Sequence, residues 1–315
     1  MRLFAFLADD GPTAGLLTID DRVVRLASAD GGLDLALAEG RFGQVLEEAA
    51  GAEAGSGADV GRRRAELEPL PALEHPGKIV CVGLNYRDHI AEQHLELPAR
   101  PMLFAKFGNA IIGDGEPIVR PEGTTALDLE VELGVVIGRR ARRVAAADAM
   151  DHVAGYLVVN DVSARDWQGN RAALREGERG DGQWLRAKGS DTFFPIGPIL
   201  ATPESIPDPH HLALRSWVTR GGATNAASSP ADAISMQDGT TADMVWQIPE
   251  LIAYISRAIT LEPGDILSTG TPAGVGVYRE PPLFLEPGDR VRCEVEGIGS
   301  VENPVVDWTT VGQDD

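Results

Sequence analysis

The stretch Asp128-Leu129-Glu130-Val131-Glu132-Leu133 decides how the rest of the chain is interpreted. Apolar and acidic residues alternate in it with a period of two, which is typical of a β-strand with two unlike faces. The three acidic side chains would share one face, about 7 Å apart along the strand. Carboxylates at that spacing repel one another unless positive charge lies among them. Such a face is either solvated or part of a cation site.

A second acidic segment bears on this choice. The run Val158-Val159-Asn160-Asp161 ends an apolar stretch with an acidic residue. Two strands that bring carboxylates to one point would form an oxygen-rich site, which a hard divalent cation prefers. The sequence therefore favours a metal site over a solvated face.

The composition is that of an ordinary globular protein. The chain has 315 residues, of which 43% are hydrophobic and 24% are charged, and this length can bury a large core. The 36 glycines and 21 prolines indicate many turns, and hence a mostly β fold of the α+β class. The formal net charge of −20 argues against a nucleic acid or an anionic membrane as the partner.

The two cysteines, Cys81 and Cys293, are too few for a disulfide framework. Cys81 lies in the apolar run 78–83, where a buried free thiol is expected. The first residues meet Asp9-Asp10 too early for a signal sequence, and no apolar window is long enough to span a membrane. We therefore expect a protein of the reducing cytoplasm, without a membrane partner.

The chain divides into two predicted domains. Residues 1–69 are expected to form a small β-rich N-terminal domain with a linker, and residues 70–315 the main domain. Helical spacing covers residues 33–50, and the Ala-, Gly- and charge-rich segment 51–64 is typical of a linker or a mobile helix. The polar, charged segment 169–183 is predicted to be a loop.

Five short motifs contain most of the candidate functional residues. They are Val82-Gly83-Leu84-Asn85-Tyr86 with His89-x-x-Glu92; Asp128-Leu129-Glu130-Val131-Glu132-Leu133; Asn160-Asp161-Val162-Ser163-Ala164-Arg165-Asp166-x-Gln168; Lys188-x-x-Asp191-Thr192-Phe193; and Gly264-Asp265-x-x-x-Thr269-Gly270-Thr271-Pro272. In this order, over about residues 78–305, the combination resembles the fumarylacetoacetate hydrolase superfamily. The resemblance implies curled, mixed β-sheets with short peripheral helices, and makes residues 70–315 the catalytic domain.

The resemblance also implies a metal site. Glu130, Glu132 and Asp161 match the three carboxylates that hold Mg²⁺ or Mn²⁺ in the family. Oxygen ligands without histidine or cysteine fit a hard cation. Asp128 lies on the same strand face without matching a ligand, and we expect it to orient a ligand or a metal-bound water.

Three residues match catalytic positions of the family. His89 and Glu92 match a pair that activates water, and their i, i+3 spacing places both on one helix face. Glu92 could then accept a proton from one imidazole nitrogen and leave the other basic, although a surface pair without function has the same spacing. Lys188 matches a lysine beside the metal, where a fixed cation stabilises a developing enolate.

Three further residues match positions near the substrate. Arg165 and Gln168 follow Asp161 in the same motif, and Arg165 could instead be the structural partner of a carboxylate. Thr271 lies in a Gly-rich turn that can present backbone N–H groups and a hydroxyl to a substrate carboxylate. These residues imply a small 2-oxo acid as the binding partner.

The implied activity is that of a divalent-metal-dependent hydrolase, which cleaves a carbon–carbon bond in an acylpyruvate-like 1,3-diketo acid by way of an enolate held at the metal. His89 would deprotonate the attacking water. Decarboxylation of a β-oxo acid such as oxaloacetate, or isomerisation of a 2-hydroxydienoate, could use the same site. An alternative of another class is a non-catalytic, metal-stabilised binding protein. Family members are usually dimers, so a homodimer or a higher homo-oligomer is expected.

Overall fold

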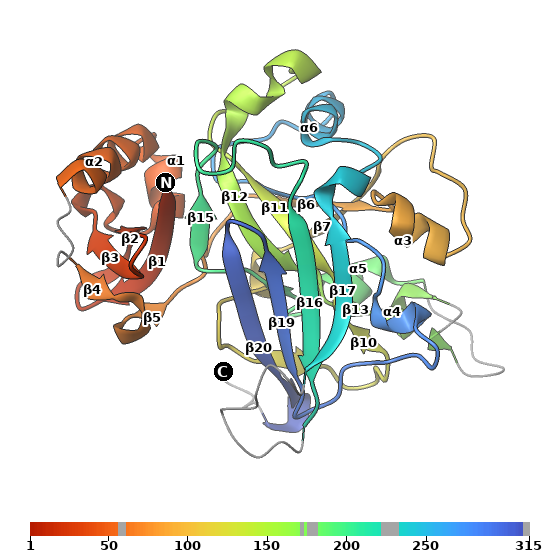
Figure 1. Cartoon of the computed structure of the whole chain (residues 1–315). Coiled ribbons are helices and arrows are strands. Elements are labelled where there is room, and N and C mark those ends of the chain that lie inside the picture. Colours follow the sequence, from red (N-terminus) through yellow and green to blue (C-terminus); the bar gives the residue numbers. More distant parts are fainter. Residues whose placement is uncertain (56–60, 171–172, 175–181, 222–232, 311–315) are drawn as a thin grey trace.

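The computed structural model describes residues 1–55, 61–170, 173–174, 182–221 and 233–310 of the chain. Strands predominate and form open, mixed sheets, with short helices at the periphery (Figure 1). The fold class predicted from the sequence is therefore confirmed. Over these same ranges, no helix is both long enough and apolar enough to cross a membrane.

The largest sheet runs from the N-terminal strands through the centre of the molecule. Its central pairs are antiparallel, except that β18 and β6 run parallel. Its strands, in spatial order, are β4 (Arg62–Arg63), β3 (Arg22–Arg25), β2 (Gly11–Leu17), β1 (Arg2–Ala8), β15 (Ile199–Ala201), β12 (Val153–Asn160), β11 (Val131–Ile137), β18 (Ile266–Ser268), β6 (Ile79–Gly83) and β7 (Met102–Lys106), with β5 (Glu68–Pro69) beside β1.

A second sheet packs against the central strands. Figure 1 shows it in front of β11 and β12, and strands β16, β19 and β20 contact them. Its order is β17 (Ile234–Thr240), β16 (Ala213–Thr219), β19 (Arg290–Val295), β20 (Gly299–Asp307) and β9 (Ile118–Arg120). Two small pairs complete the strands: β10 (Leu127–Asp128) with β13 (Ser163–Ala164), and β8 (Ile111–Ile112) with β14 (Phe194–Pro195).

The helices are short and peripheral. The α-helices are α1 (Leu33–Ala38), α2 (Phe42–Gly55), α3 (Arg87–Glu92), α4 (Arg165–Gln168), α5 (Trp184–Gly189) and α6 (Ile248–Ser256). The 3₁₀ helices are η1 (Ala27–Ala29), η2 (Arg64–Glu66), η3 (Gly108–Ala110), η4 (Ala146–His152), η7 (Thr241–Asp243), η8 (Gly276–Tyr278) and η9 (Trp308–Thr310).

The N-terminal strands join the main sheet. β1 pairs with β2 on one side and with β15 on the other, where Phe4 lies opposite Ile199. The helical spacing over residues 33–50 predicts one helix, but the chain forms α1 and α2. Gly40 has a φ of +70°, the left-handed conformation that commonly follows a helix end, and so it separates the two. Residues 56–60 of the predicted linker lie outside the described ranges, and the domain boundary at residue 69 stays a prediction.

Strand β11 is buried along its whole length. Strands β12 and β18 cover its edges, and β16 and β19 of the second sheet pack on it. A strand that is buried on both faces normally carries apolar side chains only. Glu132 is the exception in β11, and a buried carboxylate is costly unless charged or hydrogen-bonding groups surround it.

The acidic stretch 128–133 is not the single strand that its alternation predicts. Its first residues belong to β10, which pairs with β13, and its last residues to β11, which pairs with β12. The two ladders meet at Glu130, whose backbone N–H donates to the side-chain oxygen of Asn160 at 3.0 Å. Asp128, Glu130 and Glu132 are only 0%, 5% and 2% exposed, which excludes a solvated face.

Candidate active site

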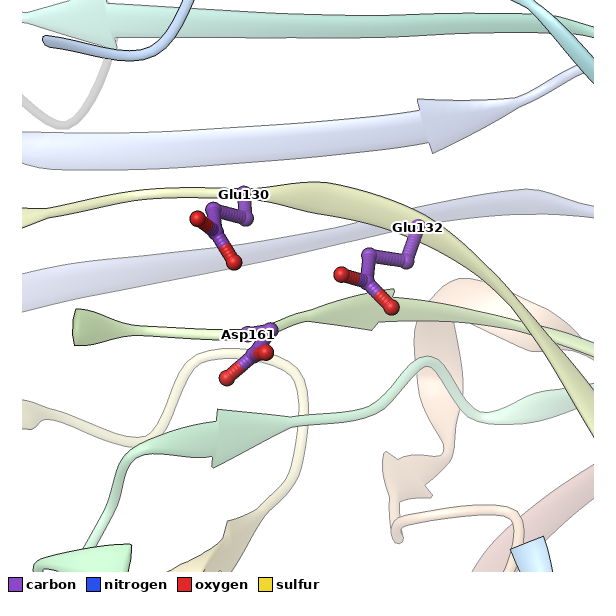
Figure 2. A group of neighbouring side chains, drawn as sticks. All are labelled: Glu130, Glu132 and Asp161. Atoms are coloured by element: carbon purple, nitrogen blue, oxygen red, sulfur yellow. The ribbon is translucent and has the colours of Figure 1, made fainter. Parts of the chain in front are cut away.

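Three carboxylates meet at the junction of the two ladders. Glu130 immediately precedes β11, Glu132 lies within it, and Asp161 follows β12. Figure 2 shows both glutamate side chains pointing toward the segment that carries Asp161. One oxygen from each residue lies within 4.8 Å of the others. The structure thus brings together the three residues that the sequence suggests as metal ligands.

Lys188, in α5, lies between two of these carboxylates. Its ammonium donates to Oε2 of Glu130 at 2.6 Å and to Oδ2 of Asp161 at 2.9 Å. Burial lowers the pKa of Lys188, but the attraction of Asp161 and Glu130 outweighs burial, so the pKa lies above its ordinary value. Lys188 therefore remains a fixed cation beside the carboxylates.

Arg165 is the partner of two carboxylates. Its Nη2 lies 2.7 Å from Oε1 of Glu130, and its Nε donates to Oδ2 of Asp128 at 2.9 Å. Asp128 also accepts hydrogen bonds from the backbone N–H groups of Gly276 and Val277, at 2.7 and 3.0 Å. Asp128 therefore orients Glu130 through Arg165, and it fixes the turn that begins at Gly276.

The chemistry of the cluster fits a divalent cation. Glu132 accepts from the backbone N–H of Gly270 at 2.9 Å, and burial, followed by repulsion from Asp161 and Glu130, raises the pKa of Glu132 well above its ordinary value. Oδ1 of Asp161 lies 2.7 Å from the ammonium of Lys106, yet it accepts no hydrogen bond within the described ranges. A buried carboxylate oxygen that accepts no hydrogen bond, together with a carboxylate crowded by two others, suits a hard cation with oxygen ligands.

The predicted acid–base pair lies on α3. Nδ1 of His89 is 2.6 Å from Oε1 of Glu92. The other oxygen of Glu92 accepts from the backbone N–H of Gly274 at 3.0 Å, which holds the carboxylate against the ring. His89 lines the same cavity as Glu130 and Lys188. The i, i+3 spacing therefore produces a direct contact, and the pair faces the carboxylate cluster.

Two of the predicted substrate-binding residues have partners of their own. Oε1 of Gln168 accepts from Nη1 of Arg165 at 3.3 Å. The hydroxyl of Thr271 donates to the carbonyl of Val131 at 2.8 Å and accepts from Nε2 of Gln237 at 2.7 Å. All three predicted residues line the cavity. The hydroxyl of Thr271 is committed to the protein, so a substrate role for this residue would fall to its backbone.

The cavity that these residues share has a volume of about 280 Å³, which suits a small acid. Both polar groups and apolar side chains line it. The apolar residues are Val82, Leu84, Leu95, Met102, Phe104 and Trp184, with the rings of Phe104 and Trp184 in edge contact at 5.6 Å. The greater part of the predicted loop 169–183 lies outside the described residues.

Sequence reasoning missed two buried residues that support the site. Lys106, at the end of β7, is fully buried and donates to the backbone carbonyls of Val162, Phe193 and Lys188. Burial lowers its pKa despite the attraction of Asp161. A lysine that ends the apolar run 102–106 was the available signal for this role.

Gln237 supports the site from the second sheet. Its Oε1 accepts from the backbone N–H of Val131 at 2.9 Å, and its Nε2 donates to Thr271. Gln237 thereby links β17 to the start of β11. No feature of the sequence indicates this contact, because β17 follows β11 by about a hundred residues and only the packing of the sheets brings them together.

Comparison with known protein families identifies the family of this chain. The model of the fumarylacetoacetate hydrolase C-terminal domain matches residues 78–306. The chain therefore belongs to the fumarylacetoacetate hydrolase superfamily, a family of enzymes, as its motifs suggest.

Individual relatives show two kinds of named activity. The chain is 45% identical over 243 residues to the mitochondrial oxaloacetate tautomerase FAHD2A of Bos taurus, covering 77% of this chain and 71% of the relative. It is 40% identical over 314 residues to the mitochondrial oxaloacetate tautomerase of Xenopus laevis, covering 97% and 90%. Among solved structures, a fumarylacetoacetate hydrolase from Exiguobacterium antarcticum superposes with a TM-score of 0.77 at 30% identity, covering 98% and 99% of the two chains.

Proposed function

We propose that this protein is an enzyme that interconverts the keto and enol forms of a small 2-oxo acid of the oxaloacetate type. The observation that carries the proposal is the contact between His89 and Glu92 in the same cavity as the carboxylates and Lys188. Tautomerisation moves one proton between carbon and oxygen, and one oriented base is enough for that. The identity with relatives named oxaloacetate tautomerases supports this choice of substrate class.

Glu130, Glu132 and Asp161 would hold the cation, which we propose to be Mg²⁺ or Mn²⁺. When bound, such a cation supplies Lewis acidity to the oxo-acid end of the substrate. Asp128 would hold the ligand set through Arg165, in the way that residues behind a metal ligand commonly do.

The side chains of the protein would move the proton. Nε2 of His89 would take it from the carbon next to the carbonyl and return it to the oxygen, while Glu92 stabilises the imidazolium that forms between the two transfers. The ammonium of Lys188 would offset the negative charge on the enolate oxygen. The backbone of Thr271, with Gln168, would contact a substrate carboxylate. The apolar side chains of Phe104 and Trp184, which line the cavity, would limit the access of water to the reacting carbon.

Hydrolysis of a carbon–carbon bond in an acylpyruvate, which the sequence favours, is our second candidate. The same pair could deprotonate a water molecule, and the hydrolase from Exiguobacterium antarcticum covers nearly the whole chain. Decarboxylation of oxaloacetate, or isomerisation as in the name of the relative from Mycobacterium marinum (33% identity, TM-score 0.70), would use the same groups. A non-catalytic binding protein has no need of His89, Glu92 and Lys188 in one cavity.

One experiment separates these reactions. The purified protein with Mg²⁺ or Mn²⁺ is mixed with the enol form of oxaloacetate, whose ultraviolet absorbance is followed while pyruvate is assayed in parallel. We expect the enol signal to decay faster than without enzyme, with no matching release of pyruvate. Pyruvate formed at the rate of enol loss would indicate decarboxylation. Activity only on an acylpyruvate panel would support the hydrolase and refute the tautomerase.

Two further proposals concern the cellular compartment and the oligomeric state of the protein. Cys81 and Cys293 are buried free thiols, which supports a reducing compartment such as the cytoplasm, although the relatives from Bos taurus and Xenopus laevis are named as mitochondrial proteins. We also propose a homodimer or a higher homo-oligomer, which is the default for a soluble enzyme of this size. Light scattering of the purified protein would test the second proposal.

A further inference from the structure

Gln93, the residue that follows the His–Glu pair, contacts the ring nitrogen on which the proposed reaction depends. Nε2 of Gln93 lies 2.8 Å from Nε2 of His89 and 3.2 Å from the backbone carbonyl oxygen of the same histidine. A carbonyl only accepts hydrogen bonds, so the amide group that faces it is the NH₂ and not the oxygen. The same NH₂ faces the ring, and Nε2 of His89 is therefore an acceptor.

The far side of the amide is fixed by Tyr278, at the end of η8. The hydroxyl of Tyr278 donates to Oε1 of Gln93 at 3.0 Å, and it accepts from Nδ2 of Asn170 at 2.7 Å. Because the amide of Asn170 supplies a hydrogen to the hydroxyl oxygen, the hydrogen of that hydroxyl is directed to Gln93. The ring of Tyr278 also packs against the imidazole of His89, with centroids 6.1 Å apart.

These contacts assign the protons of the imidazole. A neutral ring has one donor and one acceptor nitrogen. Since Nε2 accepts from Gln93, the proton lies on Nδ1, where it is donated to Glu92 at 2.6 Å. A charged imidazolium would direct a second N–H at the NH₂ of Gln93, and two donors would face each other.

The other charged groups near the imidazole ring have hydrogen-bonding or ion-pair partners other than Nε2. Asp88 accepts hydrogen bonds from the backbone N–H groups of His89 and Ala273, at 2.7 and 3.1 Å. Glu130 and Arg165 line the same cavity and are paired with each other. Among the described residues, Gln93 is the hydrogen-bonding partner of Nε2, and it is neutral.

We propose that Gln93, held by Tyr278, is a positioning residue whose NH₂ donates to the unprotonated Nε2 of His89 and covers this nitrogen until substrate displaces the amide. The inference rests on the proposed function, in which Nε2 is the base. It extends that function by adding a step, because the amide of Gln93 must move before a proton on carbon can reach the ring. Asp128 connects Tyr278 to the carboxylate cluster, since it accepts hydrogen bonds from the backbone N–H groups of Gly276 and Val277 in η8, the helix that ends at Tyr278.

Nitrogen-detected NMR of the ¹⁵N-histidine-labelled protein tests the assignment without any assay of activity. The six histidines give resolvable pairs of ring signals, and His89→Ala identifies the pair of interest. At about pH 8, above the usual titration range of histidine, we expect a protonated Nδ1 and an unprotonated, hydrogen-bonded Nε2. A proton on Nε2 in the wild-type protein would overturn the proposal.

Variants of equal length test the role of the amide. Gln93→Glu replaces the donor by an acceptor, so Nε2 of His89 should carry a proton. As a result, kcat should fall about 10–100-fold, less than on loss of the base itself. Gln93→Met should leave Nδ1 protonated, shift Nε2 to the position of an unbonded nitrogen, and lower KM about two- to tenfold, because substrate no longer displaces a hydrogen bond. Tyr278→Phe, which removes one hydroxyl, should give a weaker form of the Gln93→Met result.

Gln44→Glu is the matched control, because Gln44 is exposed on α2 and the substitution adds the same charge far from the cavity. It should leave the ring signals and the kinetics unchanged. A neutral ring in Gln93→Glu, with wild-type shifts, would refute the positioning role. Ring signals as expected, together with an active His89→Ala variant, would instead refute the proposed function and leave the assignment of the protons standing.

Discussion

The two sides of the cavity are built in different ways. The carboxylate side lies on buried central strands, and its charges are paired with Lys188, Lys106 and Arg165 from other elements. The base side lies on α3, a helix of six residues, and the chain that follows it exposes Leu95 and Leu97. The comparison suggests that metal binding depends on the sheets, and proton transfer on one short helix. Mutation should therefore separate the two functions.

The largest effect is expected on the carboxylate side. Glu132→Gln keeps the shape of a side chain in the buried strand β11 but removes one of the three charged oxygen donors. Activity with Mg²⁺ or Mn²⁺ should fall by at least about 10³-fold, since the Lewis acidity that is lost contributes several kcal/mol. Steady-state kinetics with enol oxaloacetate measures the loss. Near-normal activity at saturating metal would remove Glu132 from the ligand set.

On the base side, His89→Ala should lower kcat by about 10²–10⁴-fold, the usual contribution of a general base. The fold should be preserved, because the ring lies at the cavity and not within the apolar core. The measurement is kcat at saturating substrate, with circular dichroism as the check on folding. Glu92→Gln is the companion variant, and a larger loss there than in His89→Ala would mean that the carboxylate is itself the base.

Lys106 tests how far the sheets depend on their buried charges. Lys106→Met should destabilise the protein by about 3–5 kcal/mol, because it leaves Asp161 without its closest cation and three backbone carbonyls without their donor. Urea unfolding measures the difference in the free energy of unfolding. Arg140→Met is the control, since Arg140 pairs with Glu262 at 3.2 Å on the surface and should cost less than about 1 kcal/mol. Equal losses in the two variants would show that the buried pair is not structural.

Asp128 contacts residues on both sides of the cavity, so its substitution should affect both sides. Asp128→Asn weakens the support of Arg165 behind Glu130, and it weakens the hold on η8. Metal affinity should fall about 10–100-fold, the usual cost of a residue behind a ligand. Titration with Mn²⁺ gives this value. If Asp128→Asn abolishes metal binding as completely as Glu132→Gln, then Asp128 is a ligand and the assignment of the acidic stretch is wrong.

Sequence reasoning predicted the elements of the site better than their connections. The spacing of His89 and Glu92 is local, and one helical turn is enough to place them in contact. The alternation at residues 128–133 identified the acidic side chains but predicted a continuous strand, because periodicity does not show where a strand changes partners. Lys106 and Gln237 were missed for a related reason: each is buried by elements distant in the chain. The lysine at the end of the apolar run 102–106 indicates a buried charge but not its partners, and nothing in the sequence indicates the contacts of Gln237.

The division of metal binding and proton transfer between different elements is the central claim about this cavity. Isothermal titration with Mn²⁺ of the wild-type protein, Glu132→Gln and His89→Ala tests it most directly. We predict that His89→Ala binds Mn²⁺ with nearly the wild-type affinity, whereas Glu132→Gln shows no tight binding. Equal loss of affinity in both variants would mean that the histidine helps to hold the metal, and would contradict the division of the cavity into two sides.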